Sequence, residues 1–374
     1  MNRKQFLILV VALVVLGGAG LALFWQDIAA YRAAGAKIGA RLLPDLKVSE
    51  VEQIRLQDAK SQATLVKKGN AWVVRERGDY PADVQKIGDL LIKLAELKVT
   101  QSESVGESLL PRLDLAQPGK GEGGGTLVEF KGAADKTLAS LILGKTVLKK
   151  DPVNPLPGAQ NGVPAGRYVL VAGARDTVVV VSDPLSGAEA GPAQWLLKDF
   201  FKADRIRTLT VGEGAAQWKI TRDEEYGQWK FASGSGTLDA SAAVGAANAL
   251  SGLAFDDVVT GSREGETEHP GTVTAETFDN LTYTLKVARR KAGGDYDVSF
   301  AVSGEPPAKR VPEKNEKPED KARLDKEFAE TLKKLEERIA REKALAKWTY
   351  VVSAKQLAPL MKERAQMIAA RPKK

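Results

Sequence analysis

The sequence predicts an α+β protein in which one N-terminal transmembrane helix precedes two related α+β modules. The first observation behind this prediction is a stretch without charge, residues 6–25. The second is an order of short strands and one amphipathic helix that occurs twice. The third is a charged, helix-patterned insertion in the second copy, residues 305–347. The predicted regions are a cytoplasmic tail and anchor (1–30), a juxtamembrane linker (31–50), a first module (51–203) and a second module (204–374).

The stretch from Phe6 to Trp25 contains no charged side chain. In a helix that rises about 1.5 Å per residue, its roughly 20 residues span about 30 Å, the thickness of the hydrocarbon core of a bilayer. Phe24 and Trp25 end it with aromatic side chains that favour the membrane interface. We therefore predict a retained membrane anchor. The alternative is a cleaved secretory signal, which would have a shorter apolar core and a better small-x-small site than Ala19-Gly20-Leu21.

Charges on both sides of the anchor bear on its orientation. Arg3 and Lys4 precede it, whereas Arg32, Lys37 and Arg41 follow closely, so the positive-inside comparison is nearly balanced. A very short basic tail before an apolar segment is typical of an uncleaved signal anchor. We expect a single pass through the membrane, with the bulk of the chain outside the cytoplasm.

Composition excludes several classes of site. Apolar residues make up 43% and charged residues 28% of the 374-residue chain, which is enough for more than one globular domain. The net charge of +7 is spread along the sequence and aromatic residues are few, so no nucleic-acid partner is expected. The chain has no cysteine, which excludes disulfides, thiolate nucleophiles, Cys-based zinc sites and lipid attachment to cysteine. A single histidine excludes multi-histidine metal sites.

The first module begins with short strands and a turn. Alternating apolar residues on both sides of Gly69-Asn70 predict a hairpin. Asp83 stands where it can cap a helix whose apolar residues recur every three or four positions. That apolar face comprises Val84, Ile87, Leu90, Leu91, Leu94 and Leu97. Strands are predicted at 54–56, 63–68, 71–74, 126–130, 137–143, 168–171 and 177–181. A short helix, Trp195–Phe200, is expected to close the module.

The same order returns about 150 residues later at low identity. Strands are predicted at 206–209, 217–220, 229–231, 282–287, 297–302 and 350–353, with 282–287 and 297–302 repeating the pair 126–130 and 137–143. Asp239 takes the place of Asp83 at the start of a second helix. The apolar face of that helix comprises Val244, Ala247, Leu250 and Leu253. Trp72 and Trp229 occupy matched strand positions, which favours a core role over ligand stacking.

One stretch interrupts the second module. Residues 305–318 are rich in Pro, Lys and Glu and predict an exposed linker. Residues 319–347 predict a helix whose charges have favourable i,i+4 spacing in the pairs Glu319–Arg323, Glu330–Lys334 and Glu337–Arg341. A narrow apolar stripe comprises Leu324, Phe328, Leu332, Leu335 and Ile339. The helix either lies back on the second module or forms a coiled-coil arm for self-association or a partner.

Two glycine motifs resemble phosphate-binding loops without the required context. Gly119–Gly124 has the letters G-x-G-x-x-G, but a predicted strand follows it, whereas a dinucleotide site needs the strand before it and a helix after it. Gly144-Lys145-Thr146 resembles the end of a P-loop, yet Ala139 stands at the position of the first glycine. Ser233–Gly236 reads as a loop and lacks a nucleophile elbow. We expect no cofactor.

Few residues could carry catalysis. His269, in the polar segment 266–270, is predicted to be a solvent-exposed side chain in a turn rather than a metal ligand or general base. Asp223-Glu224-Glu225 and Asp256-Asp257 could supply paired carboxylates for glycoside chemistry, but acidic runs at turns are usually solvated. We therefore predict no catalytic, cofactor-binding or metal-binding residue and no enzyme activity. A carboxylate-based hydrolase is the least favoured alternative.

A series of segments in the first module resembles the family called domain of unknown function 4340. The segments are the hairpin 69–74, the helix start Tyr80–Asp83, the helix end 94–99, Leu113–Leu115 before Pro118, the strand end 143–145 and the strand 168–170. The resemblance covers roughly residues 51–200, and the second module matches more loosely. It implies a single-pass envelope protein of a bacterial inner membrane, with its bulk in the periplasm or otherwise outside the cytoplasm. It also implies that the protein accompanies an ABC-type transport system related to gliding-motility components. No catalytic residues are known for the family, so none carries over.

The resulting hypothesis is a membrane-anchored, extracytoplasmic, non-catalytic scaffold or accessory subunit of an ABC-type transport assembly. It would contact the membrane through residues 6–25 and protein partners, possibly transporter subunits among them, through sheet edges or the helix 319–347. The alternative is a binding module for an envelope polymer or small ligand, which predicts an aromatic-lined groove between the modules. The oligomeric state stays open.

Overall fold

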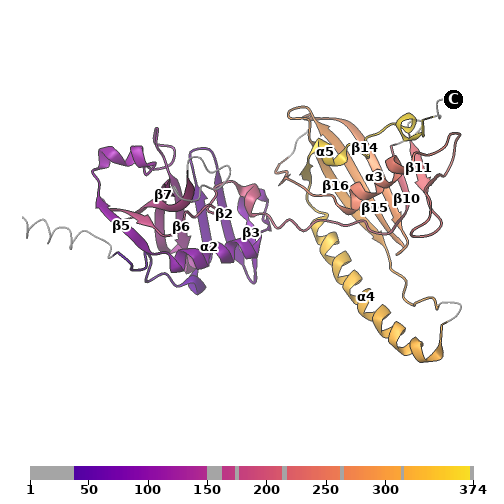
Figure 1. Cartoon of the computed structure of the whole chain (residues 1–374), viewed down its shortest axis with the longest axis horizontal. Coiled ribbons are helices and arrows are strands. Elements are labelled where there is room, and N and C mark those ends of the chain that lie inside the picture. The colour runs from indigo at the N-terminus through magenta and orange to yellow at the C-terminus, as the bar shows by residue number, and fades with distance from the viewer. Residues whose placement is uncertain are drawn as a thin grey trace, which may run out of the picture. The chain divides into compact units, whose positions relative to one another are not determined.

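A computed structural model describes residues 38–149, 162–172, 177–212, 217–261, 265–312 and 316–370. The predicted anchor, residues 6–25, lies outside these ranges. No helix within them is long and apolar enough to cross a membrane. The chain divides into two compact units, Met1–Leu197 and Lys198–Lys374, and each is built on one antiparallel sheet with few helices (Figure 1). The described chain is therefore an α+β protein, as predicted.

The first unit contains a nine-stranded sheet among its described residues, in the order β4-β3-β2-β1-β6-β7-β8-β9-β5. Its strands are β1 (Gln53–Gln57), β2 (Gln62–Lys68), β3 (Ala71–Val74), β4 (Tyr80–Pro81), β5 (Val99–Ser104), β6 (Thr126–Lys131), β7 (Thr137–Lys149), β8 (Val163–Val171) and β9 (Thr177–Val181). Gly69, with φ of +61°, makes the predicted turn between β2 and β3. The short 3-10 helices are η1 (Val48–Glu50), η2 (Arg75–Arg77), η3 (Glu107–Leu113), η4 (Ala133–Asp135) and η5 (Pro192–Trp195).

Helix α2 (Val84–Glu96) covers one face of this sheet. The Asp83 side chain accepts a hydrogen bond from the Lys86 backbone N–H at 3.2 Å, so the predicted cap is present. Ile87, Leu90, Leu91 and Leu94 are buried. Val84 is 56% exposed, and its predicted place on the buried face was wrong. At the first helical position it lies about 60° around the axis from Ile87, on the flank of the helix.

Part of the predicted linker belongs to the first unit. The Gly39 backbone N–H donates to the Val99 carbonyl at 2.8 Å, and the Val99 N–H donates to the Ala40 carbonyl at 3.0 Å. The Leu42 N–H likewise donates to the Leu97 carbonyl at 2.7 Å. These bonds fix the chain against the start of the edge strand β5.

The second unit contains an eight-stranded sheet among its described residues, in the order β12-β11-β10-β14-β15-β16-β17-β13. Its strands are β10 (Ile206–Val211), β11 (Trp218–Thr221), β12 (Lys230–Phe231), β13 (Asp257–Val258), β14 (Thr267–Thr277), β15 (Leu281–Arg290), β16 (Tyr296–Gly304) and β17 (Tyr350–Val352). Its helices are α3 (Ala240–Ser251), α4 (Pro318–Leu345), α5 (Ala354–Leu357) and the 3-10 helix η7 (Arg364–Met367).

Helix α3 packs through small side chains. Asp239 caps it by accepting a hydrogen bond from the Ala242 N–H at 2.8 Å, as predicted. Its buried residues are Ala242, Ala243, Ala246 and Leu250. Val244 is 46% exposed, so the predicted face through Val244 was wrong. In this helix the alanines face the sheet, and an alanine face is harder to recognise in a sequence than a leucine face.

The two sheets have the same strand order. Every strand of the first sheet except β4 has a counterpart at the same place in the second sheet. In order along the sheets, β3, β2, β1, β6, β7, β8, β9 and β5 correspond to β12, β11, β10, β14, β15, β16, β17 and β13. The same type of bond also closes each unit. The Asp83 N–H donates to the Trp195 carbonyl at 2.8 Å, and the Asp239 N–H donates to the Met367 carbonyl at 2.9 Å. In each case the start of the long helix is tied to a terminal 3-10 turn.

The predicted helix Trp195–Phe200 does not form. The 3-10 helix η5 ends at Trp195, and Leu196 then pairs with Ala82 in an isolated β-bridge. Trp195 is buried in the first unit, whereas the Phe200 ring packs in the second unit at 4.5 Å from the ring of Tyr350. The apolar residues of this stretch therefore serve two cores rather than one helix face.

One long strand was missed. Residues 266–270 were predicted to form a turn, but they lie largely in β14, where His269 has φ of +49°. The pairing with β15 shifts register between Glu268 and Gly271, a bulge that accommodates Pro270. In the shared strand order β14 corresponds to β6, so residues 282–287, which lie in β15, correspond to β7. The prediction matched them with residues 126–130 in β6, which is one strand too early.

The tryptophans have different roles from those predicted. Trp72 and Trp229 are only half-buried. The guanidinium carbon of Arg222 lies over the Trp229 ring, 4.8 Å from the ring centroid. The deeply buried tryptophans among the described residues are Trp195 and Trp218. Each donates its ring N–H to a backbone carbonyl, which satisfies the one polar group that its burial removes from water.

Loss of either helix cap should destabilise the unit that contains it. We expect Asp83→Ala and Asp239→Ala each to lower the free energy of unfolding by about 1 kcal/mol, because an N-terminal N–H loses its acceptor. Urea unfolding, followed by circular dichroism, measures the change. The control is Asp89→Ala on the exposed face of α2, for which we expect a change within about 0.5 kcal/mol. An equal loss in all three variants would contradict the capping role.

Candidate functional site

The glycine motifs occupy positions that do not suit phosphate binding. Gly119–Gly124 lies in the loop between η3 and β6, and no helix follows it before the strand. Gly144–Thr146 lies inside β7, at a shift in the register with β8 that ends where Thr146 pairs with Arg167. Neither segment opens a helix, so neither presents the helix N-terminus that a phosphate site uses.

The two acidic runs lie at opposite edges of the second sheet. Asp223 is 79% exposed and pairs with Lys230 at 2.6 Å, while Glu225 pairs with Arg205 at 3.0 Å near the edge strand β12. Asp257 lies in β13, at the other edge, and accepts a hydrogen bond from the Val258 N–H. Within the described ranges no three acidic or histidine side chains gather in a way that could hold a metal ion. The arrangement does not bring these carboxylates into one cleft.

The inserted helix α4 projects from the second unit. It occupies the connection between β16 and β17, and Figure 1 shows it extending away from the sheet. Its buried residues, Ile339, Glu342 and Leu345, all lie in the last two turns. From 318 to 338 its side chains are exposed or half-buried. The prediction that the helix lies back on the module was therefore wrong for most of its length. At about 1.5 Å per residue, this free part spans about 30 Å. We call residues 305–337 the arm and residues 338–345 its root.

A buried carboxylate fixes the root. Glu342 is 2% exposed and accepts hydrogen bonds from the Lys202 backbone N–H at 3.0 Å and from the Tyr283 hydroxyl at 2.9 Å. The Arg338 guanidinium lies 3.7 Å away and also contacts Asp204 at 3.2 Å. Burial raises the pKa of the Glu342 carboxyl above its usual value, although the hydrogen bonds and Arg338 oppose this. Burial and the facing carboxylate also raise the pKa of Tyr283.

Ion pairs order the arm itself. Arg310, in the linker, binds Glu316 at 2.7 Å and Asp325 of α4 at 2.8 Å, so the linker is held against the helix. Arg323 pairs with Asp320 and Glu327 rather than with Glu319 as predicted. The exposed Arg323 pairs contribute only a few tenths of a kcal/mol each, about 0.3–0.5 for i,i+4 pairs. The buried root, not these pairs, determines the direction of the helix.

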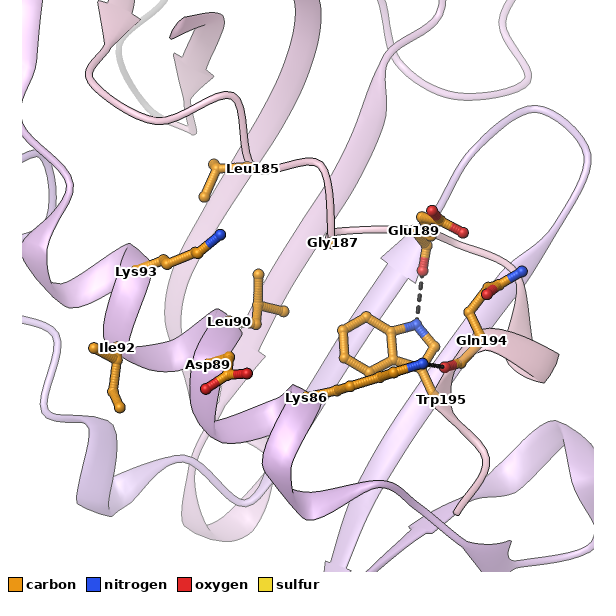
Figure 2. Close-up of a pocket in the computed structure, with 10 residues that line it drawn as sticks. All are labelled: Lys86, Asp89, Leu90, Ile92, Lys93, Leu185, Gly187, Glu189, Gln194 and Trp195. Carbon is orange, nitrogen blue, oxygen red and sulfur yellow. Dashed lines mark hydrogen bonds between the residues drawn. The ribbon is translucent and has the colours of Figure 1, made fainter. Parts of the chain in front are cut away.

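A second candidate surface is a groove of about 420 Å³ in the first unit. One wall is α2, and the other is the segment from Leu185 to Trp195, which is irregular up to Gly191 and ends in η5 (Figure 2). The Lys86 ammonium donates to the Gln194 carbonyl at 2.9 Å, and the Trp195 ring N–H donates to the Glu189 carbonyl at 2.7 Å. The residues that line this α2 groove are Lys86, Asp89, Leu90, Ile92, Lys93, Leu185, Gly187, Glu189, Gln194 and Trp195.

The α2 groove has the chemistry of a binding site. Leu90, Leu185 and the Trp195 ring, which are at most 4% exposed, form its apolar floor, while Lys86 and Lys93 supply cations at the edge of α2. Its volume lies in the lower part of the range of about 300–1,000 Å³ that is usual for small-molecule sites. No histidine, serine or threonine is among its lining residues, so none stands beside these lysines as a nucleophile or base. The groove suits an apolar group that carries a charge.

Sequence reasoning missed this groove because its second wall has no periodic pattern. Residues 183–191 form neither helix nor strand. A long-range backbone bond, from Asp83 to Trp195, brings them beside α2. The buried Trp195 was the one available signal, and it was assigned to a helix instead. By contrast, the arm was predicted as a helix at 319–347, close to its observed bounds Pro318–Leu345.

Comparisons of the chain with protein-family models, with curated proteins and with solved structures gave no match. The resemblance to domain of unknown function 4340 therefore stays a prediction. Function has to be argued from the geometry of the arm and the α2 groove.

Removing the buried carboxylate should unfasten the root. We expect Glu342→Ala to lower the free energy of unfolding of the second unit by about 3–5 kcal/mol, because Arg338 and the Tyr283 hydroxyl lose their buried partner. Chemical unfolding measures the loss. The matched control is Glu336→Ala on the exposed arm, with an expected change within about 0.5 kcal/mol. Similar values for the two variants would show that Glu342 does not hold the root.

The stability of the second unit should also depend on pH through Glu342. Its pKa in the folded protein is raised above the ordinary 4.5, so its contribution to stability is full below that value. The contribution is lost as the pH rises through the folded pKa. We therefore expect wild type to lose stability relative to Glu342→Gln as the pH is raised from 4.5 to neutrality. Unfolding at a series of pH values tests this, and parallel profiles for the two proteins would contradict it.

Proposed function

We propose that this protein is a membrane-anchored, non-catalytic scaffold or accessory subunit, and that the arm is its main partner-binding element. The observation that carries this proposal is the contrast between the two ends of α4. The root is buried through Ile339, Glu342 and Leu345, whereas the arm contacts little of its own unit. A helix fixed at one end and exposed along the rest presents its surface at a defined distance from the sheet.

The arm does not strengthen the core of the unit that carries it. Its surface is dominated by charged side chains, and its half-buried residues Leu324, Phe328, Leu332 and Leu335 form a narrow stripe. Most helices in globular proteins obtain their stability by packing an apolar face on tertiary structure. A helix of this length with such a small buried face is better explained by contacts with another protein, in which an amphipathic stripe can lie in a groove.

We infer that the two units descend from a duplication. The shared strand order and the matched closing bonds support this inference. The arm lies in the connection between β16 and β17, and the matching connection in the first unit, between β8 and β9, is much shorter. β8 and β9 are separated by residues 172–176, whereas β16 and β17 are separated by residues 305–349. The arm is thus an addition to one copy, which is consistent with a specialised role for the second unit.

Two parts of the proposal rest on the sequence. The anchor is proposed from the uncharged stretch 6–25, which would place the two units outside the cytoplasm of a bacterial cell. The partner is proposed to be an ABC-type transport assembly because of the resemblance to domain of unknown function 4340. The geometry of the arm supports a protein partner in general and does not select this one.

A binding module for a small ligand or envelope polymer is the second candidate. The observation that favours it is the α2 groove, with its apolar surface and flanking lysines. This groove lies within the first unit and contains one aromatic ring, Trp195, rather than the aromatic-lined groove that was expected between the modules. It is compatible with the accessory role, since a groove of this kind also accepts a side chain of a protein partner.

The arm can be removed without its root. In the test variant, residues 306–336 are replaced by a short Gly-Ser linker, which keeps Ile339, Glu342 and Leu345. Wild type and variant are tagged, extracted in mild detergent and purified, and the co-purifying proteins are identified by mass spectrometry. We expect wild type to enrich transporter permease and ATPase subunits, and the variant to recover about tenfold less of them, which corresponds to about 1.4 kcal/mol of binding.

Thermal unfolding of the variant is the control for an intact second unit. Recovery of the same proteins with and without the arm would contradict its binding role. Recovery of this protein alone, even after crosslinking, would contradict the accessory role and favour the ligand-binding alternative.

A further inference from the structure

The first sheet carries an apolar row on the side turned away from its main core. Leu127, Ile142 and Leu170 stand directly opposite one another on β6, β7 and β8. Successive side chains of a strand point to opposite faces of the sheet. The row therefore lies on the other face from the fully buried Val128 and Leu141, which are its neighbours along the strands.

The second sheet does not repeat this row. On the corresponding strands β14, β15 and β16, Thr274, Thr284 and Ala301 stand opposite one another and alternate with the buried Val273 and Leu285. Threonine suits the face of an antiparallel sheet that meets water. The apolar row is thus particular to the first unit and is not required by the fold that the two units share.

The 3-10 helix η3 covers part of the row and has no described counterpart in the second unit. It lies in the connection between β5 and β6. In the connection between β13 and β14, the described residues 259–261 and 265–266 form no helix. Leu110 and Leu113 of η3 pack on a cluster that includes Leu115 and Ile142. The first unit has therefore gained a segment that packs on its second face.

Two glycines from the motifs noted in the sequence seat this segment. A Cβ atom on Gly144 would clash with the Leu113 carbonyl, and one on Gly123 would clash with the Pro111 carbonyl. Glycine allows this close approach because it has no side chain to hold the backbones apart. Leu115, which is 1% exposed, then fixes the end of the segment. The space between η3 and the sheet is thus formed before any ligand arrives.

A groove of about 420 Å³ remains there, and we call it the η3 groove. Leu110, Leu127 and Leu170 line it and are half-buried, so part of their surface is open to a ligand. The apolar floor of the α2 groove, by contrast, is at most 4% exposed. No aromatic ring is among the residues that line the η3 groove. Its apolar surface is therefore aliphatic.

The polar groups of the η3 groove select the charge of a ligand. Glu107 is the one charged residue among those that line it. The Glu107 side chain is exposed and forms no ion pair with another described residue. Gln117 and Ser140 add an amide and a hydroxyl. A carboxylate with no cation beside it attracts a cationic group and repels an anionic one.

We propose that the η3 groove binds a small aliphatic amine. Its alkyl group lies on the row of Leu127, Ile142 and Leu170, and its ammonium group pairs with Glu107 at the rim. The volume suits a small ligand, since it lies in the lower part of the usual range of about 300–1,000 Å³. This site is separate from the arm and from the α2 groove, whose lysines favour other ligands.

The absence of cysteine from the chain makes the site easy to probe. Ser140→Cys places the only thiol of the protein in the groove, on a half-buried position and with a side chain of similar size. The full-length protein in mild detergent is treated with methyl methanethiosulfonate, and the rate of thiol modification is followed by mass spectrometry. A ligand in the groove slows this reaction. The matched control is Thr137→Cys, an exposed position on the same strand that does not line the groove.

The probes n-hexylammonium, n-hexanol and n-hexanoate share one alkyl chain and differ in charge. We expect n-hexylammonium to half-protect the Ser140→Cys thiol at a concentration about threefold lower than n-hexanol, which is the size of effect that an exposed ion pair gives. We expect n-hexanoate to require a higher concentration than either, because Glu107 repels it. None of the probes should protect the Thr137→Cys thiol.

Adding Glu107→Gln to Ser140→Cys tests the ammonium contact. In this variant n-hexylammonium and n-hexanol should protect at the same concentration, because the advantage of the ammonium group depends on the carboxylate. Glu107 is exposed, so the change should leave folding intact, which thermal unfolding checks.

Four outcomes would overturn the proposal: no protection by any probe, equal protection by n-hexanoate and n-hexylammonium, an ammonium advantage that survives Glu107→Gln, or equal protection of the Thr137→Cys thiol. The test involves neither the arm nor the α2 groove. The η3 groove and the proposed accessory role can therefore fail separately.

Discussion

The burial of Glu342 is the constraint on which the second unit depends. An ionised carboxylate loses several kcal/mol of solvation when it leaves water, and only close partners restore it. The partners here come from three parts of the unit: the backbone of Lys202 before the first strand, Tyr283 in β15, and Arg338 on α4 itself. One side chain thus joins the start of the unit, the sheet and the inserted helix. The direction in which the arm leaves the sheet follows from these contacts.

The two units show two ways to pack a helix on sheets of the same strand order. In α2, leucine and isoleucine fill the space above the sheet, and exposed aliphatic residues remain on the outer side. In α3, alanines allow the helix to lie close to the sheet. The segments that follow differ as well. Leu357 and Leu360 are fully buried at the end of the second unit, while the first unit has Gly187, Ala188 and Ala190 there and retains a groove. The first unit therefore offers a groove, and the second offers an arm.

Local signals made much of the fold predictable. Asp83 and Asp239 were assigned as caps because a cap depends on residues three positions apart, and both bonds are present. The Gly69 turn and most strands are equally local. Elements that break the local pattern were missed. Pro270 and the bulge beside it disguised β14, and polar residues disguised the edge strand β5, whose pairing with β9 joins segments about 80 residues apart.

The candidate sites divide in the same way. The arm was predicted because its charges and stripe have a helical period, but whether it lay on the module depended on the burial of Glu342, which no local pattern shows. The α2 groove could not be predicted, since its second wall is an irregular segment placed by long-range bonds. Val84 and Val244 were assigned to buried faces because periodicity shows which residues share a side of a helix, but not where the sheet beneath it ends.

Hydrogen–deuterium exchange of the full-length protein tests most directly whether the arm is a rooted partner-binding helix. It would be measured in a mild-detergent extract that retains co-extracted proteins, and again after purification to the single chain. We predict that amides of residues 318–337 exchange at least about tenfold more slowly in the extract, while those of the root, residues 338–345, are slow in both samples. Equal exchange of the arm in the two samples, or rapid exchange of the root, would contradict the account.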